Sequence, residues 1–188
     1  MKKIILAFLL GISVSSMAQS TVGLIAHWDM NGTANDVSGH GHNGTLHNVT
    51  SDTGINGLPN TAYYFNGTNA FIGATYKPDL NLTKYTICAT VKVEGFYSGT
   101  CGANAIFARG AMNGVPGHYD LYFTDVIHSC SSTIDTTDET FAPGGGGNSI
   151  AAGLPTIHYT PVIQKNQWYR VVLTYDSTSW KCYVNGVL

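Results

Sequence analysis

Charged residues are scarce in this chain of 188 residues, in which Asp, Glu, Lys and Arg make up 11% of the sequence. Only two are glutamates, Glu94 and Glu139, and neither lies in a run that alternates like a strand. A glycoside hydrolase needs two carboxylates that face each other across the scissile bond. The nearest acidic group, Asp135, Asp138 and Glu139, has the surroundings of a solvated loop. We therefore expect no catalytic residue and no enzyme activity.

Long apolar runs and basic clusters are also missing. The run Ile4–Ile12 follows two lysines and precedes Ser16 and Ala18, which have the spacing of a signal-peptidase site. It is too short to span a bilayer. We expect residues 1–18 to be a signal peptide and residues 19–188 to form one secreted domain. That domain has seven basic and eleven acidic residues, which argues against nucleic acid and membrane partners.

Good helix formers such as Glu, Lys, Arg and Gln are few, whereas Gly, Thr, Asn, Tyr and Val are plentiful. No stretch repeats its apolar residues at the helical period. The composition predicts an all-β fold, and the number of short strands predicts a two-sheet antiparallel β-sandwich. The expected strands are Gly23–Trp28, Gly44–Val49, Thr61–Phe65, Ala70–Gly73, Tyr85–Val93, Ala105–Arg109, Tyr119–Thr124, Trp168–Asp176 and Trp180–Asn185.

The clearest strand signal lies at the end of the chain. Apolar and aromatic residues alternate with polar ones through Trp168–Asp176, as in a half-buried strand. Asn185 and Gly186 then form the strongest short hairpin signal, because a type I′ turn needs positive φ at both central residues. A strand is expected to return after this turn, yet Leu188 is the last residue. We expect the fold to lack its final strands.

Several blocks carry a family resemblance. The first block, residues 23–46, reads GLIAHWDMNGTANDVSGHGHNGTL. The next blocks, in chain order, are residues 62–72 (AYYFNGTNAFI), residues 85–93 (YTICATVKV) and the closing WYRVVLTYD and KCYVNGVL. These blocks resemble laminin-G-like domains, which are concanavalin-A-like jelly rolls of the lectin and glucanase class. Residues 95–110 and 117–125 are similar to a subgroup of secreted Bacteroidetes surface proteins. The chain departs from this family by lacking the strands that normally follow VNGVL.

The resemblance implies a concanavalin-A-like jelly roll at a bacterial cell surface, within a longer parent protein. It implies a non-catalytic extracellular module that binds a carbohydrate or a protein. Two other functions stay open: a structural or adhesive domain without a small-molecule ligand, and, more remotely, a glycoside hydrolase. Because one jelly roll hosts many functions, the fold alone does not choose among them.

Domains of this class often hold a structural Ca²⁺ through carboxylate, amide and backbone oxygens. In the two Gly-rich turns, Asp36 and Asn66 are the candidate oxygen donors. Asp36 has an alternative role as a simple turn former, because Asp side chains bond to nearby backbone groups.

Four cysteines allow three disulfide pairings in a secreted protein. Cys101 and Cys130 flank a central segment, and the resembled subgroup carries Cys at both places, so this pairing is favoured. Cys88 and Cys182 lie in expected strands. They could bridge across the sandwich or remain two buried thiols.

Aromatic residues could stack on sugar rings, although core packing explains most of those in strands. Phe96 and Tyr97 are the exception, because they follow Gly95 at the start of a loop. We expect these two rings to be the ligand-binding aromatics if they are exposed.

Overall fold

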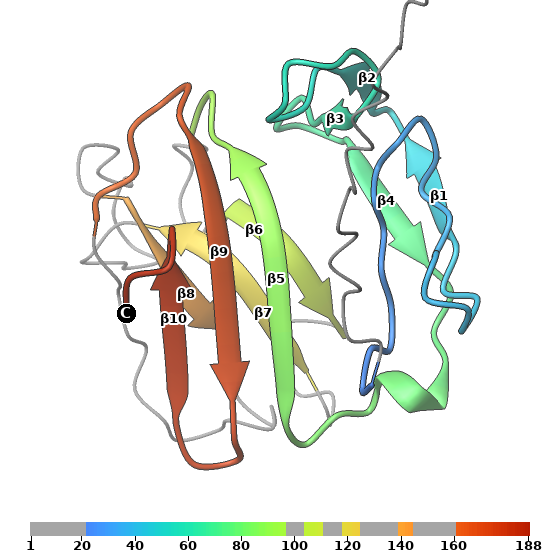
Figure 1. The fold of residues 1–188 in the computed structure, drawn as a ribbon, viewed down its shortest axis with the longest axis vertical. Helices are drawn as coiled ribbons and strands as arrows, with labels where there is room; N and C mark the ends of the chain where they lie inside the picture. Colours follow the sequence, from blue (N-terminus) through green and yellow to red (C-terminus); the bar gives the residue numbers. More distant parts are fainter. Residues whose placement is uncertain (1–21, 97–103, 111–117, 125–138, 145–160) are drawn as a thin grey trace, which may run out of the picture.

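The computed structural model describes residues 22–96, 104–110, 118–124, 139–144 and 161–188 (Figure 1). Within these residues the protein is all-β and antiparallel, as the composition predicts, with a single-turn 3₁₀ helix, η1 (Pro78–Leu80). No helix of this described part is long and apolar enough to cross a membrane. The strands are β1 (Gly44–His47), β2 (Thr50–Asp52), β3 (Ala62–Tyr64), β4 (Phe71–Ala74), β5 (Tyr85–Lys92), β6 (Asn104–Arg109), β7 (Tyr119–Thr124), β8 (Thr140–Gly144), β9 (Trp168–Tyr175) and β10 (Trp180–Val184).

The described strands form four small sheets, whereas the sequence predicts two larger ones. Two of the sheets have three strands, in the orders β10-β9-β5 and β6-β7-β8. Figure 1 shows the first in front of the second. Their inner faces meet through aromatic rings: Tyr85 stacks on Tyr119 at 4.5 Å, and Phe141 meets Tyr169 edge-on at 5.4 Å. This face-to-face packing is consistent with a β-sandwich.

The alternation in β9 decides which residues form the core. Tyr169, Val171, Leu173 and Tyr175 are buried, and the residues between them are more exposed. Their partners on β5 are Val91, Ala89, Ile87 and Tyr85, which therefore point to the same face. On β10, Trp180, Cys182 and Val184 complete this buried layer.

The other two sheets, β1-β4 and β2-β3, lie to one side of the three-stranded pair (Figure 1). Isolated two-stranded ribbons are marginal in water. Close packing helps to hold β1-β4, because a Cβ at Gly44 would lie 2.6 Å from Ile72 and 3.0 Å from Ala34. Only glycine fits at this crossing without a shift of its neighbours.

Two strands were missed by the sequence prediction, and one expected strand does not form. β2 is short and polar, so it carries no apolar alternation. β8 contains Pro143 and Gly144, which are unfavourable inside a central strand, but β8 is an edge strand, where proline is tolerated. The segment Gly23–Trp28 makes only an isolated bridge, between Trp28 and Asp36. Its backbone bonds instead to residues of the following loop.

The hairpin turn at Asn185 and Gly186 is confirmed. Both residues have positive φ, 52° and 84°, as a type I′ turn requires. Val184 and Val187 exchange backbone hydrogen bonds of 2.8 and 3.1 Å across the turn. The return of the chain thus starts at Val187.

Because Leu173 is fully buried between the sheets, we expect Leu173→Ala to lower the free energy of unfolding by about 2–5 kcal/mol. Arg170→Ala, on the exposed face of the same strand, is the matched control. Urea denaturation followed by tryptophan fluorescence measures both. Equal effects of the two variants would contradict the assignment of the core face.

Candidate functional site

A groove of about 2280 Å³ opens in the described part of the chain. We call it the edge groove. One wall is the segment 23–31, another is residues 61–68, which include β3, and the floor comes from residues 84–96 and 104–107. The groove thus runs between the N-terminal part of the chain and the free edges of both three-stranded sheets.

Aromatic side chains give the edge groove its binding potential. Tyr64 and Phe65 are 43% and 47% exposed, and Trp28, Tyr63 and Trp168 are half-buried. The indole nitrogen of Trp28 donates a hydrogen bond of 2.7 Å to the carbonyl of His42. Exposed rings of this kind can stack on a sugar ring or cover an apolar side chain.

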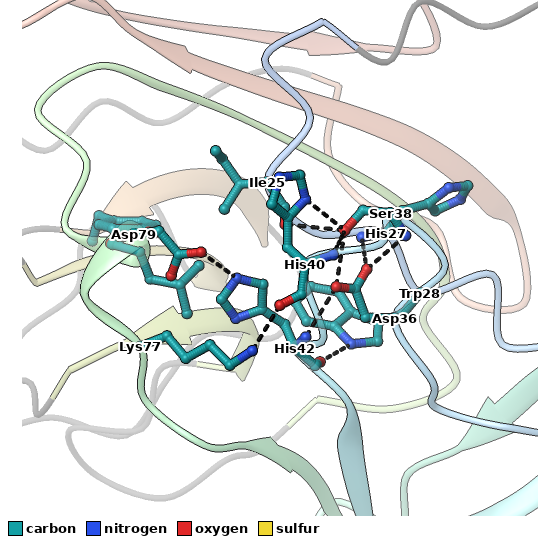
Figure 2. A network of polar contacts seen from close by, with 11 residues as sticks. Ile25, His27, Trp28, Asp36, Ser38, His40, His42, Lys77 and Asp79 are labelled. Atoms are coloured by element: carbon teal, nitrogen blue, oxygen red, sulfur yellow. Dashed lines mark hydrogen bonds and ion pairs between the residues drawn. The ribbon is translucent and has the colours of Figure 1, made fainter.

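Asp36 organises the loop behind the groove wall (Figure 2). Its Oδ1 accepts hydrogen bonds from the backbone N–H of His27 and of Ser38, both at 2.9 Å. Its Oδ2 accepts from the Ser38 hydroxyl at 2.8 Å and from the His42 N–H at 2.9 Å. One carboxylate therefore joins the segment 23–31 to two positions of the loop.

These bonds govern the acidity of Asp36. Burial alone would raise its pKa, but the donors of His27, Ser38 and His42 outweigh burial and hold the pKa well below its usual range. The carboxylate is therefore ionised at any physiological pH.

A second contact ties the same loop to η1 (Figure 2). The His42 ring is fully buried, and its Nε2 lies 3.1 Å from Oδ2 of Asp79. Nearby, the Lys77 ammonium donates a hydrogen bond of 2.7 Å to the carbonyl of His40. These interactions brace the groove wall against the chain that leads into β5.

The two predicted calcium donors are both engaged in turns. The side-chain oxygen of Asn66 accepts three backbone N–H bonds, from Thr68, Asn69 and Ala70, at 2.9–3.1 Å. Asp36 has both oxygens occupied by protein donors, as described above. No three His, Cys, Asp or Glu side chains gather as metal ligands within the described ranges. These oxygens fit turn formation better than calcium coordination, and calcium binding stays a prediction.

Phe96 is half-buried rather than freely exposed. Its ring meets Phe123 edge-on at 5.8 Å, and the Lys165 ammonium lies 5.1 Å from the ring centre. It packs at the margin of the core and also lines the edge groove. Tyr97, its predicted partner in ligand binding, lies outside the described residues.

The structure corrects the prediction for Cys88 and Cys182, which are both free thiols. Cys182 is opposite Leu173 in the buried layer, whereas Cys88 is opposite Val172 and points to the other face of the same sheet. A bridge through the sheet is impossible, since paired cysteines need Cβ atoms that face each other. Nor are both buried, because Cys88 is exposed. Cys101 and Cys130 lie outside the described residues.

Sequence reasoning missed two polar groupings. The Arg109 guanidinium lies 5.4 Å from the ring centre of Tyr76, and the Asn81 side chain hydrogen-bonds to both residues. Only folding brings these three together. The buried contact between His118 and Asp120, at 3.1 Å, did have a signal, because residues two apart in extended chain share a face and His118 directly precedes β7.

Comparisons of this chain with protein families, with curated proteins and with solved structures found no match. The resemblance to laminin-G-like domains therefore rests on the sequence blocks alone.

We expect Asp36→Asn to lower the free energy of unfolding at pH 7 by about 1–3 kcal/mol, because an amide cannot accept all four hydrogen bonds. The folded-state pKa of Asp36 is depressed. Its contribution is therefore present above the unfolded-state pKa, about 4, and is lost as pH falls further. Urea denaturation between pH 7 and pH 2 measures the free energy of unfolding. This free energy should fall less steeply with acid in the variant than in the wild type.

The control is Asp29→Asn, because exposed Asp29 accepts hydrogen bonds from its near neighbour Asn31 and, among the described residues, from no other. If the free energy of unfolding of Asp36→Asn depends on pH as in the wild type, the role given to this carboxylate is refuted.

In the folded protein we expect Cys88 to react with a maleimide and Cys182 to resist it. Cys88 is exposed, whereas Cys182 is buried. Burial raises the pKa of both thiols, that of Cys182 to about 12. Peptide mapping by mass spectrometry, with and without urea, distinguishes the two sites. Finding a peptide that links Cys88 to Cys182 under non-reducing conditions would contradict their placement on opposite faces.

Proposed function

We propose that this chain is a non-catalytic extracellular module that binds a carbohydrate or a protein in the edge groove. The observation that carries the proposal is the groove itself, about 2280 Å³ in volume and lined by accessible aromatic rings. Ligand sites are typically concave, with aromatic walls and a few polar groups. Here Asp29 and Asn31 on one wall and Lys84 on the floor supply polar groups.

A laminin-G-like jelly roll is the architecture we propose for this module. Face-to-face packing of two antiparallel sheets supports it, as does a closing hairpin at the expected place. The sequence block at residues 23–46 also folds back tightly around Asp36, in keeping with its Gly-rich turn pattern. The signal-peptide pattern at residues 1–18 supports secretion.

The groove rings are the part of the proposal that mutation tests most directly. We expect the double variant Tyr64→Ala and Phe65→Ala to weaken ligand binding by about 10-fold or more. Phe71→Ala is the matched control, because Phe71 is 53% exposed on β4 but does not line the groove. Binding is measured on a glycan array and on a panel of immobilised extracellular proteins.

The same measurements with EDTA test for calcium. Loss of binding with the chelator, restored by added Ca²⁺, would add a metal to the proposed module. Silence on every glycan and every protein would defeat the proposal and favour a purely structural role. If Phe71→Ala weakens ligand binding as much as the double variant does, the binding site does not lie in the edge groove.

A further inference from the structure

Among the described residues, the edge of β5 that faces the groove has no neighbouring strand. β5 is the last strand in the order β10-β9-β5. Among the described residues no strand pairs with its other side, and residues 84–96 line the groove. An edge strand presents a row of free N–H and C=O groups, which is a template for another strand.

The hydrogen-bond pattern identifies which β5 residues face outward. Asn185 donates its N–H to the Arg170 carbonyl at 2.8 Å, and Asp176 donates to Ser179 at 3.3 Å. The even-numbered residues of β9 therefore bond to β10. Because an antiparallel strand alternates its bonding side, the odd-numbered residues of β9 bond to their odd-numbered partners on β5.

It follows that the even-numbered residues of β5 direct their N–H and C=O groups to the groove. These residues are Thr86, Cys88, Thr90 and Lys92. No backbone hydrogen bond of Thr86, Cys88 or Thr90 is seen among the turn and loop contacts of the described chain.

The opposite wall makes its backbone hydrogen bonds to its own loop. His27 uses its N–H to bond Asp36 and its carbonyl to accept from Val37, and the Ile25 carbonyl accepts from the Ser38 hydroxyl. Residues 25 and 27 thus bond toward the loop. In an extended segment the residues between them point the other way. The backbone of Ala26 is therefore turned away from the loop, in a segment that lines the groove.

The floor of the groove suits an alternating strand. Ile87, Ala89 and Val91 on β5, with Ile106 and Phe107 on β6, pack against the core and also line the groove. A strand added beside β5 would cover these apolar groups with every second side chain. Its remaining side chains would lie on the outer face, beside Thr86 and Thr90.

We propose that the edge groove binds one extended polypeptide segment of a partner protein, which adds a strand to β5 through Thr86, Cys88 and Thr90. This inference rests on the proposed binding function and narrows its ligand to a peptide. Main-chain hydrogen bonds supply the affinity in strand addition, and alternate side chains supply the specificity. A sugar ring offers no row of donors and acceptors at the spacing of a β-ladder.

The probe is a pool of synthetic peptides of eight residues, the length of β5, in which Val, Ile or Tyr alternates with Thr or Ser. Members that bind are studied on the purified protein by NMR hydrogen exchange. We expect slowed exchange at the amides of Thr86, Cys88 and Thr90. The odd-numbered amides of β5 should change little, since they are already bonded to β9.

The variant Thr90→Pro removes one groove-facing N–H and leaves the bonds to β9 in place. A sheet tolerates proline at such a position, because the lost N–H lies at its edge. We expect it to weaken binding of the selected peptides by about 10-fold. Thr90→Val keeps the N–H and should bind like the wild type. Circular dichroism checks the fold of both. If Thr90→Pro does not fold, the exchange pattern of the wild type still decides.

Four outcomes would overturn the inference. In the first, no peptide of the pool binds, and in the second, folded Thr90→Pro binds the peptides as tightly as the wild type. In the third, a glycan from the array slows exchange at the amides of Thr86, Cys88 and Thr90. In the fourth, exchange at these amides is already slow without peptide because the chain forms a dimer. The glycan outcome would leave the proposed binding function intact. If no peptide, glycan or protein binds, both this inference and the proposed binding function are refuted.

Discussion

The aromatic layer between the two three-stranded sheets is the contact on which the rest of the structure depends. Tyr85 and Tyr169 from one sheet meet Tyr119 and Phe141 from the other. Aromatic rings bury the largest areas per residue, so a few of them fix the spacing and the faces of both sheets. Once β5 and β6 are held in this way, their outer edges form the floor of the edge groove.

The N-terminal part is held by a different kind of interaction. Its strands are short and largely exposed, and polar contacts supply the order instead. Asp36 joins the segment 23–31 to its own loop, and the pair formed by His42 and Asp79 joins that loop to η1. A carboxylate that accepts four hydrogen bonds fixes geometry with little apolar burial. The groove therefore has one wall set by the core and one set by polar contacts.

Local patterns predicted the parts that depend on local chemistry. The alternation in β9 and the Asn185-Gly186 turn were read correctly, because strand period and positive φ are properties of short stretches. β8 was missed, since the tolerance of Pro143 depends on its being at an edge. The site was harder to predict. Asp36 was found as a turn former, but the edge groove is built from segments far apart in the chain.

The cysteines show the same division. Sequence alone placed Cys88 and Cys182 in strands, and only the register put them on opposite faces of one sheet. By itself, the sequence determined the all-β class, the strand alternation and the turns, because these follow from backbone sterics and side-chain polarity. Tertiary structure decided which of the described strands lie at sheet edges and which rings reach the groove. Those features depend on which strands become neighbours, and the pairing of β5 with β9 joins segments that lie far apart in the chain.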